Sequence, residues 1–324
     1  METVPCDLCG SPESVLVAKQ TDKLHSTTEE VFYVVSCSHC GLTFTNPRPS
    51  RKEIGRYYAE LYAFHDAPTL LRRLGGALAS KLVNSPLSIL VDLVPPIAHR
   101  LIPYLKPKIS DPVRAYYAKG GQGDFLDIGC GGGASAHFWG KNGALLAYRS
   151  LASVAGVEVA ERARASLHVA GIEAWPNLES VPANRKFGMI RMNWSLEHVH
   201  APSEYFSFIR DRLLPGGLAM IAVPNYDGLI YRVAPDCLEL PIHLFHFKPS
   251  DIYNYAVRYG LRVVNMQTFS YPHMFVAAAK VGLLPEAFAK TTGLRSAKAF
   301  QTTLHQFDKS NMGNDLIAIL EADD

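Results

Sequence analysis

From residue 123 to the end of the chain, short apolar runs alternate with stretches that repeat their apolar residues at helical spacing. Buried parallel strands are apolar throughout, and the helices between them cover both faces of the sheet. The sequence therefore predicts an α/β fold with a central, mostly parallel sheet and helices on both faces. The expected strands cover 125–128, 153–158, 171–175, 187–192, 218–223, 262–268 and 315–320, and the expected helices lie from Ala134 onward, over 160–170, near 202–214 and within 272–312.

The pattern before residue 119 is different. Residues 31–35, Val-Phe-Tyr-Val-Val, are rich in β-formers and suit a hairpin. Ser50, with Glu53 three positions later, has the form of a capping box and predicts the start of a helix. Residues 68–118 carry apolar residues on two faces at helical spacing. We expect them to form a helical subdomain that packs on the core and helps to roof a pocket.

The most apolar part of this subdomain, 82–105, is interrupted by polar residues and prolines, so it does not predict a membrane span. Contact with a membrane surface or with a lipid-linked substrate is the alternative interpretation. Basic residues that would suit such a contact accompany the apolar ones at Lys81, Arg100, Lys106 and Lys108.

Composition narrows the classes of protein. Hydrophobic residues make up 48% of the 324 residues, which is enough for a sizeable core. The formal net charge of +2 gives no reason to expect a surface for nucleic acid. The first residues, METVPCDLCG, lack the basic and apolar regions of a secretory signal. We therefore expect a cytosolic protein.

Four of the six cysteines form two similar patterns, Cys6-x-x-Cys9-Gly10 and Cys37-x-x-Cys40-Gly41. In a cytosolic chain such pairs are typical of metal ligands rather than of disulfides. Four thiolates match the tetrahedral preference of zinc, and a closed site of this kind has no open position for catalysis. The sequence predicts a structural zinc ribbon, with metal-free thiol pairs as the alternative.

The first strand of the expected sheet runs into a glycine-rich loop that contains Gly129, Gly131 and Gly133. This loop fits a dinucleotide fingerprint as well as a loop that holds S-adenosylmethionine. Both cofactors also need an acid at the end of the second strand, where a carboxylate accepts hydrogen bonds from ribose hydroxyls. Glu158 occupies that place. The glycines alone do not distinguish a nicotinamide-dependent dehydrogenase from a methyltransferase.

Three features favour S-adenosylmethionine. Asp127 lies inside the first strand, where its negative charge would repel a pyrophosphate but would suit an ammonium and a sulfonium. The fourth strand ends in a polar and aromatic tip, Asn193-Trp194. The sequence Leu-Leu-Pro-Gly-Gly at 213–217 leads into the fifth strand, which ends in Val-Pro-Asn at 223–225.

At these successive distances, FLDIGCGGG, GVE, SLEHVHAP, LLPGG and VPN resemble class I S-adenosylmethionine-dependent methyltransferases. The cysteine pairs, CGLTFTNPRPS and YYxxxY are similar to a bacterial subgroup with an N-terminal zinc-binding segment, many of whose members act in sugar, polysaccharide or secondary-metabolite pathways. The resemblance implies a Rossmann-like sheet of seven strands whose seventh strand runs antiparallel beside the fifth. The cofactor-binding residues that we expect are Asp127, Gly129, Cys130, Gly131, Gly133, Glu158, Asn193, Trp194 and Tyr58.

Transfer of a methyl group mainly needs alignment and desolvation, but a hydroxyl acceptor also needs a base. His198, His243 and His246 are candidates, because they lie near the expected strand ends. His243 is the first candidate, since the loop after the fifth strand should face the methyl group. The alternative for each histidine is that it only holds its loop by hydrogen bonds.

Glu197-His198 resembles the acid–histidine pair of ubiquinone-biosynthesis O-methyltransferases, where the pair can take part in a metal site. Trp194 stands where those enzymes have an additional acid. We therefore favour hydrogen bonding by this pair at the start of the following helix.

The sequence predicts three parts: a zinc ribbon over 1–50, a helical linker or lid over 51–118, and a class I methyltransferase domain over 119–324, with 272–312 as a helical insertion before the last strand. The predicted function is methylation of a small molecule, at an oxygen atom of a sugar, a sugar nucleotide or a secondary metabolite. The alternatives are an RNA methyltransferase, which the balanced charges of the ribbon disfavour, and a non-catalytic scaffold that binds the cofactor.

Overall fold

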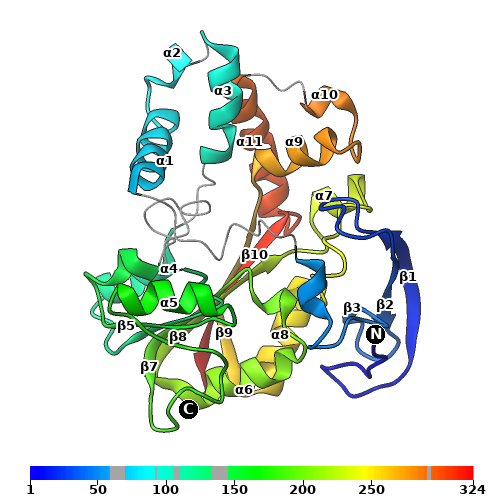
Figure 1. The fold of residues 1–324 in the computed structure, drawn as a ribbon, viewed down its shortest axis with the longest axis vertical. Coiled ribbons are helices and arrows are strands. Elements are labelled where there is room, and N and C mark those ends of the chain that lie inside the picture. Colours follow the sequence, from blue (N-terminus) through cyan, green and yellow to red (C-terminus); the bar gives the residue numbers. More distant parts are fainter. Residues whose placement is uncertain (59–69, 92, 106–109, 133–144, 290–292, 324) are drawn as a thin grey trace.

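A seven-stranded sheet forms the centre of the computed structural model, which describes residues 1–58, 70–91, 93–105, 110–132, 145–289 and 293–323 (Figure 1). The strands lie in the order β6-β5-β4-β7-β8-β10-β9. Strand β10 pairs antiparallel with both β8 and β9, while the other neighbours pair in parallel. The predicted α/β fold is therefore confirmed, including an antiparallel seventh strand beside the fifth.

The strands coincide closely with the apolar runs that predict them. Their bounds are β4 Phe125–Ile128, β5 Val154–Val157, β6 Glu173–Trp175, β7 Phe187–Asn193, β8 Leu213–Pro224, β9 Leu261–Phe269 and β10 Asp315–Ala322. Every residue of β4 and β5 is buried, as expected for parallel strands covered on both faces. The helix expected from Ala134 falls on residues 133–144, which lie outside the described ones.

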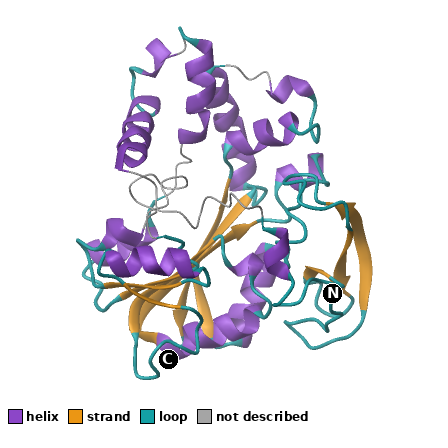
Figure 2. Cartoon of the chain, in the orientation of Figure 1, coloured by secondary structure: helices purple, strands orange, loops and turns teal. Residues whose placement is uncertain are grey.

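Helices cover both faces of the sheet (Figure 2). On one face α6 (Pro202–Arg212) and α8 (Pro249–Arg258) pack Phe206 and Tyr255 against the sheet core. On the other face α4 (Pro112–Ala118) and α5 (Glu161–Val169) contribute Val113 and Leu167. These layers place the carboxyl ends of β4, β5 and β7 at one edge, where ligands of such sheets bind.

Residues 1–50 contain a smaller antiparallel sheet of β1 (Ser14–Thr21), β2 (Val31–Cys37) and β3 (Thr43–Thr45). Hydrogen bonds join this region to the large sheet and its helices. The Asp7 carboxylate accepts hydrogen bonds from Ser203 and from the Tyr255 hydroxyl. The Lys248 ammonium donates to the Gly41 carbonyl oxygen. The small sheet is therefore held against α6 and α8.

The capping-box pattern at Ser50 introduces a turn of 3-10 helix, η1 (Ile54–Tyr57), rather than an α-helix within the described residues. The Glu53 carboxylate accepts hydrogen bonds from the backbone N–H and the hydroxyl of Ser50. In a capping box the side chain at the third position accepts a hydrogen bond from the backbone N–H of the capping residue, and Glu53 does so for Ser50.

Residues 70–105 are mostly helical where they are described, as predicted. They form α1 (Leu70–Val83), α2 (Ser88–Val91), α3 (Pro95–Leu101) and the 3-10 turn η3 (Ile102–Tyr104). Val91, Ala98 and Ile102 form a small core with Leu294 and Ala297 of α11 (Leu294–Lys309). Further short helices are η5 (Leu145–Tyr148), η6 (Leu196–His198), α7 (Leu229–Val233), α9 (Pro272–Lys280) and α10 (Glu286–Ala289). Among the described residues, none of these helices meets the length and hydropathy that a membrane crossing requires.

Candidate functional site

The loop after β4 packs closely against the segment that follows β7. Gly129 has φ +77° and Gly131 has φ +54°, values that favour glycine. A Cβ atom at Gly129 would lie 2.5 Å from the Cβ atom of Ser195, so a side chain there would collide with the segment after β7. Gly133, the third predicted glycine, lies outside the described residues.

Glu158 lies at the end of β5 with its carboxylate turned toward this loop. One oxygen accepts a hydrogen bond from the Gly131 backbone N–H at 2.8 Å, and the other accepts from the Ala160 N–H at 2.9 Å. The side chain is buried. The predicted acid and the predicted glycine loop are therefore in direct contact.

Cys130 points away from the loop into the core. A Cβ atom at Gly156 of β5 would lie 2.5 Å from the Cys130 sulfur, so the thiol fills the space that this glycine leaves. Burial raises the pKa of the Cys130 thiol well above its usual range. Its side chain packs, and only the backbone of Cys130 belongs to the loop surface.

Asp127 forms a buried ion pair that the sequence pattern does not predict. Its two carboxylate oxygens accept hydrogen bonds from Arg191 Nε at 2.8 Å and Arg191 Nη2 at 2.6 Å. Asp127 and Arg191 are directly opposite in the parallel register of β4 and β7. The guanidinium also lies 5.3 Å from the Phe125 ring centre and 5.2 Å from that of Tyr148. Arg191 thus balances the carboxylate charge that we expected to face the cofactor's cationic groups.

The tip of β7 is fixed by a second acid. Trp194 has φ +52°, and its indole N–H donates to Asp315 Oδ1 at 2.8 Å. The indole also meets the Phe269 ring edge-on, with 6.1 Å between ring centres. Burial raises the pKa of Asp315 to about 7. Asn193, the preceding residue, ends β7 opposite Ala222 of β8.

His198 and His243 lie together beside a buried acid. Their ring centres are 4.6 Å apart. His198 Nδ1 lies 2.9 Å from the Ile242 carbonyl oxygen. Because a carbonyl only accepts, Nδ1 carries the hydrogen and Nε2 carries the lone pair. This Nε2 lies 3.9 Å from Glu197 Oε1.

Both carboxylate oxygens of Glu197 are buried without a hydrogen-bond partner among the described residues. Burial raises the pKa of Glu197 well above its usual range. Ligand atoms of Glu197, His198 and His243 all lie within 4.8 Å of one another. Tyr58 borders this group, with its hydroxyl 3.3 Å from His198 Nδ1. Glu197, His198, His243 and Tyr58 therefore form one compact group of polar side chains.

A second acid, Glu239, supports His243 from the other side. His243 Nε2 lies 3.9 Å from Glu239 Oε1. Glu239 Oε2 accepts a hydrogen bond from His25 Nε2 at 2.8 Å, and this bond raises the pKa of His25. Burial lowers the pKa of His243 to about 4. His243 is therefore neutral at pH 7, next to a carboxylate that His25 holds in place.

His246 makes contacts that fix its loop. Its Nε2 lies 3.3 Å from Thr45 Oγ1, and its backbone N–H donates to the Thr43 carbonyl oxygen. The Thr45 hydroxyl in turn donates to the His243 carbonyl oxygen at 3.1 Å. Thr45 therefore connects both histidines to β3. Burial lowers the pKa of His246 to about 3.

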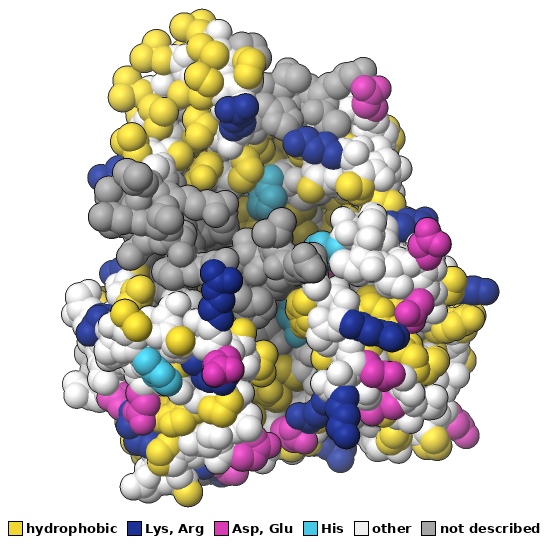
Figure 3. All heavy atoms as spheres, viewed as in Figure 1, with side chains coloured by type: hydrophobic (Ala, Val, Ile, Leu, Met, Phe, Trp, Pro, Cys, Tyr) yellow, Lys and Arg dark blue, Asp and Glu magenta, His cyan; other side chains and the backbone are white. Residues whose placement is uncertain are grey.

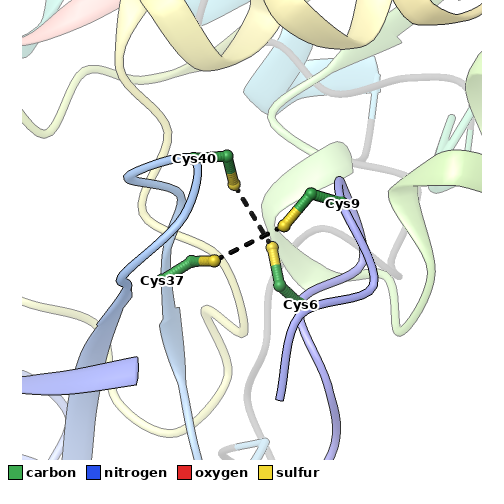
Figure 4. Close-up of side chains that lie close together, drawn as sticks. All are labelled: Cys6, Cys9, Cys37 and Cys40. Atoms are coloured by element: carbon green, nitrogen blue, oxygen red, sulfur yellow. Dashed lines mark hydrogen bonds between the residues drawn. The ribbon is translucent and has the colours of Figure 1, made fainter. Parts of the chain in front are cut away.

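The four predicted metal ligands come together at the base of the small sheet (Figure 4). The Cys6 and Cys40 sulfurs are 3.5 Å apart, and so are those of Cys9 and Cys37. Gly10 and Gly41 both have φ +78°, and their N–H groups donate to the Cys6 and Cys37 carbonyl oxygens. Zinc–sulfur bonds of about 2.3 Å in a tetrahedron place sulfurs a little under 4 Å apart, which matches this arrangement.

Comparison with protein families is decisive for the large domain. The family described as "Methyltransferase domain" matches residues 95–266, which is more than half of the chain. The chain belongs to this methyltransferase family. It is therefore an enzyme that uses S-adenosylmethionine as its methyl donor.

Solved structures with a similar fold are methyltransferases of low sequence identity. An S-adenosylmethionine-dependent methyltransferase from Mesorhizobium loti is 18% identical, with a TM-score of 0.42 over 64% of this chain and 95% of that chain. One from Archaeoglobus fulgidus is 16% identical, with a TM-score of 0.43 over 65% and 91%. The methyltransferase CcbJ from Streptomyces caelestis is 14% identical, with a TM-score of 0.42 over 67% and 91%. No curated protein matches the sequence.

In this methyltransferase the described loop residues fit the cofactor. Gly129 and Gly131 leave the backbone after β4 without side chains, and Glu158 places a carboxylate at the end of the adjacent strand. Such a carboxylate accepts hydrogen bonds from ribose hydroxyls, and a side-chain-free loop admits a ligand against its backbone.

Four residues that contact the predicted site residues are not singled out by the sequence: Arg191, Asp315, Glu239 and His25. One signal was present, because an arginine within the apolar run Phe-Gly-Met-Ile-Arg-Met-Asn at 187–193 requires a buried partner. Glu239 and His25 carry no such signal, since they meet only through the packing of two loops that are 214 residues apart.

Proposed function

We propose that this methyltransferase transfers a methyl group to an oxygen atom of a small molecule, namely a sugar, a sugar nucleotide or a secondary metabolite. The observation that carries the proposal is the neutral His243 beside Glu239 and His198. A hydroxyl acceptor needs a base, and a neutral imidazole backed by a carboxylate is the usual form of that base.

The proposed cofactor site is built around the strand ends of β4, β5 and β7. When bound, S-adenosylmethionine supplies an electrophilic methyl group on a sulfonium. The chain's part is to orient the ligand with the backbone of Gly129 and Gly131 and with the Glu158 carboxylate. The remaining proposed contacts are the backbone of Cys130, Gly133, Asn193, Trp194 and Tyr58. The Asp127–Arg191 pair makes Asp127 a support of the strand rather than a free charge.

The proposed role of His243 is to take the proton of the acceptor hydroxyl. Burial lowers the pKa of His243 to about 4, so the imidazole holds a free lone pair at neutral pH. Burial disfavours ionisation of Glu239, yet its neighbours His243 and His25 hold its pKa below the usual range. A proton that reaches His243 is therefore stabilised by the adjacent carboxylate. His198 borders the same space, and His246 orients the loop.

We propose proton transfer in preference to a catalytic metal at Glu197, His198 and His243. The position of a further acid ligand is held by Trp194, whose indole N–H is directed to Asp315. The hydrogen on His198 Nδ1 is donated to the Ile242 carbonyl oxygen, which leaves Nε2 ready to accept a proton from the acceptor side.

The cysteine cluster is proposed as a structural zinc site, and residues 1–50, 51–118 and 119–324 as ribbon, helical lid and catalytic domain. The sulfur spacing supports zinc, and four thiolates leave no open position on the metal. Metal analysis of purified protein should find one zinc per chain, which Cys9→Ser should abolish. Cys237→Ser, at a buried cysteine outside the cluster, is the matched control.

The function is tested by measuring binding and turnover in parallel. Calorimetry with S-adenosylhomocysteine tests the cofactor site, and a methyl-transfer screen over sugars, sugar nucleotides and phenols tests the acceptor class. His243→Gln should lower kcat by about 10²- to 10⁴-fold and leave cofactor affinity unchanged. His305→Gln, on the outer part of α11, should change neither. Full turnover by His243→Gln would remove the proposed base.

A further inference from the structure

The helical lid exposes a continuous apolar surface that the proposed function does not use. We call it the apolar tip and define it as Leu87, Ile89, Leu90, Leu93, Val94 and Ile97. Their exposed fractions run from 44% at Val94 to 75% at Leu93. Figure 3 shows apolar side chains gathered over the end of the molecule that these helices form. Large apolar side chains so exposed and so close together mark an interaction surface.

The short helix α2 turns its polar side chain inward and two of its apolar side chains to the solvent, the reverse of an ordinary surface helix. In α2 the hydroxyl of Ser88 points inward, where it accepts a hydrogen bond from the Lys298 ammonium at 2.6 Å, while Ile89 and Leu90 point outward. The inner face is already satisfied, because Val91 and Ala98 pack on Leu294 and Ala297 of α11. A segment that is apolar on both faces has a second apolar surface left to cover.

Basic residues outnumber acids in the sequence that forms the tip. Lys81 of α1 and Arg100 of α3, in the helices next to the tip along the chain, are exposed. No aspartate or glutamate occurs among the described residues of 70–105, and the sequence from 70 to 110 contains six basic residues against a single acid, Asp92, which lies outside the described residues. An apolar surface in a segment with such an excess of basic residues is complementary to a layer of lipid tails beneath anionic headgroups.

We propose that the apolar tip binds the surface of an anionic lipid bilayer. The elements of the tip are too short to cross a bilayer, since α2 has 4 residues and α3 has 7. They can lie in the headgroup layer, with Leu90 and Leu93 in the acyl boundary and Lys81 and Arg100 against lipid phosphates. In a symmetric dimer, by contrast, the excess of basic residues on one copy would face the same excess on the other. This proposal does not depend on the identity of the methyl acceptor.

The experiment is co-sedimentation of the full-length chain with vesicles of phosphatidylcholine alone and with vesicles that also contain phosphatidylglycerol. Binding should be strong only to the anionic vesicles and should weaken as salt is added. Leu90→Glu with Leu93→Glu should reduce binding at least about tenfold, because both side chains would carry charge into the acyl boundary. Lys81→Gln with Arg100→Gln should reduce it roughly five-fold for each cation removed.

A matched control uses equally exposed apolar residues elsewhere. Val15 and Leu16 of β1 are 57% and 61% exposed, so Val15→Glu with Leu16→Glu makes the same chemical change away from the tip. This variant should bind vesicles like the unaltered chain, and thermal unfolding should show both variants folded. Equal binding of the two variants, or no binding of the unaltered chain to anionic vesicles, would overturn the proposal. A dimer in sedimentation velocity that Leu90→Glu with Leu93→Glu dissolves, without vesicle binding, would also overturn it and assign the tip to a second copy.

Discussion

At the residue scale, the ion pair of Asp127 and Arg191 places two opposite charges in the interior of the sheet. Both side chains are almost completely buried, and their polar atoms meet in a bidentate contact. Removing one partner leaves the other charge buried and alone. Arg191→Met should therefore lower the free energy of unfolding by about 3–5 kcal/mol, measured by urea denaturation.

The double variant separates the cost of an isolated charge from the value of the pair. Asp127→Leu together with Arg191→Met replaces both ions by apolar groups, and it should recover most of the stability that Arg191→Met loses. If the double variant is as unstable as the single one, packing of the arginine between Phe125 and Tyr148 would be the dominant contribution.

Asp315 should make stability depend on pH. Burial raises its pKa to about 7 in the folded chain, from 3.8 as the ordinary value. Between these values the unfolded chain releases the proton while the folded chain keeps it, so stability falls as pH rises through this window. Asp315→Asn keeps the acceptor for Trp194 but cannot ionise. It should be more stable than the unaltered chain at about pH 8, with an advantage that shrinks toward about pH 4.

Urea unfolding of both proteins across this range measures the effect. The exposed Asp323, near the end of the chain, provides a control, because Asp323→Asn removes a carboxylate that water solvates. A constant difference between Asp315→Asn and the unaltered chain at all pH values would show that Asp315 is ionised in the folded state.

A substitution at Glu158 tests whether its carboxylate binds the cofactor. Charge-assisted hydrogen bonds contribute about 1.5–3 kcal/mol each, so Glu158→Ala should weaken binding of S-adenosylhomocysteine by on the order of a hundredfold. Calorimetry measures this directly. Glu161→Ala, at the first residue of α5, makes the same chemical change nearby and should leave the affinity unaltered. Equal affinity in Glu158→Ala and the unaltered chain would remove Glu158 from the site.

At the scale of elements, β3 and the loop that carries His243 behave as one piece. The Thr45 N–H donates to the Leu244 carbonyl oxygen, and the Thr45 hydroxyl lies between His243 and His246. Thr45→Val keeps the shape and the backbone bond but removes the hydroxyl. It should lower kcat by roughly tenfold through misplacement of His243, while cofactor affinity stays unchanged. Thr43→Val, whose side chain makes none of these contacts, is the comparison; a loss of the same size there would contradict the role of the hydroxyl.

The elements themselves can be predicted from the sequence because their signal is local. A buried parallel strand is a short run of apolar residues, and 125–128 or 218–223 can be recognised without knowing their neighbours. The turn at η1 shows the limit, since the capping pattern at Ser50 is satisfied although the described turn is 3-10. Capping fixes where a helical turn begins, but tertiary packing determines whether that turn continues as an α-helix.

The site depends on distant contacts, and these explain what the sequence could not predict. The glycine loop and Glu158 are predictable, because consecutive strands of a parallel sheet end at the same edge. Glu239 and His25 meet across loops of two different parts of the chain. No period or spacing encodes such a meeting. The cysteine cluster is the exception among these distant contacts, because each of its two Cys-x-x-Cys pairs is itself a local motif.

At the scale of the whole molecule, the proposed ribbon holds several parts of the proposed reaction site in place, including Glu239 through His25. Its β3 holds the histidine loop, and its Asp7 holds α6 and α8. Removing the proposed zinc with a strong chelator should therefore lower both the melting temperature and kcat. Without the cation, the negative charges of the four thiolates would repel one another. Thermal unfolding and turnover should recover together when zinc is returned. Full activity of a zinc-free chain would contradict this dependence.

The contact between Thr45 and His243 also has a consequence for how the protein is made. The two residues are 198 positions apart, and synthesis proceeds from the N-terminus. Both Cys-x-x-Cys pairs leave the ribosome long before residues 243–247 are synthesised. If the cluster holds zinc as proposed, the ribbon would have all four ligands of its metal while the catalytic sheet is still being translated. On this proposal the histidine loop is completed against a ribbon that has already formed, so metal supply during translation would determine how many active molecules a cell obtains.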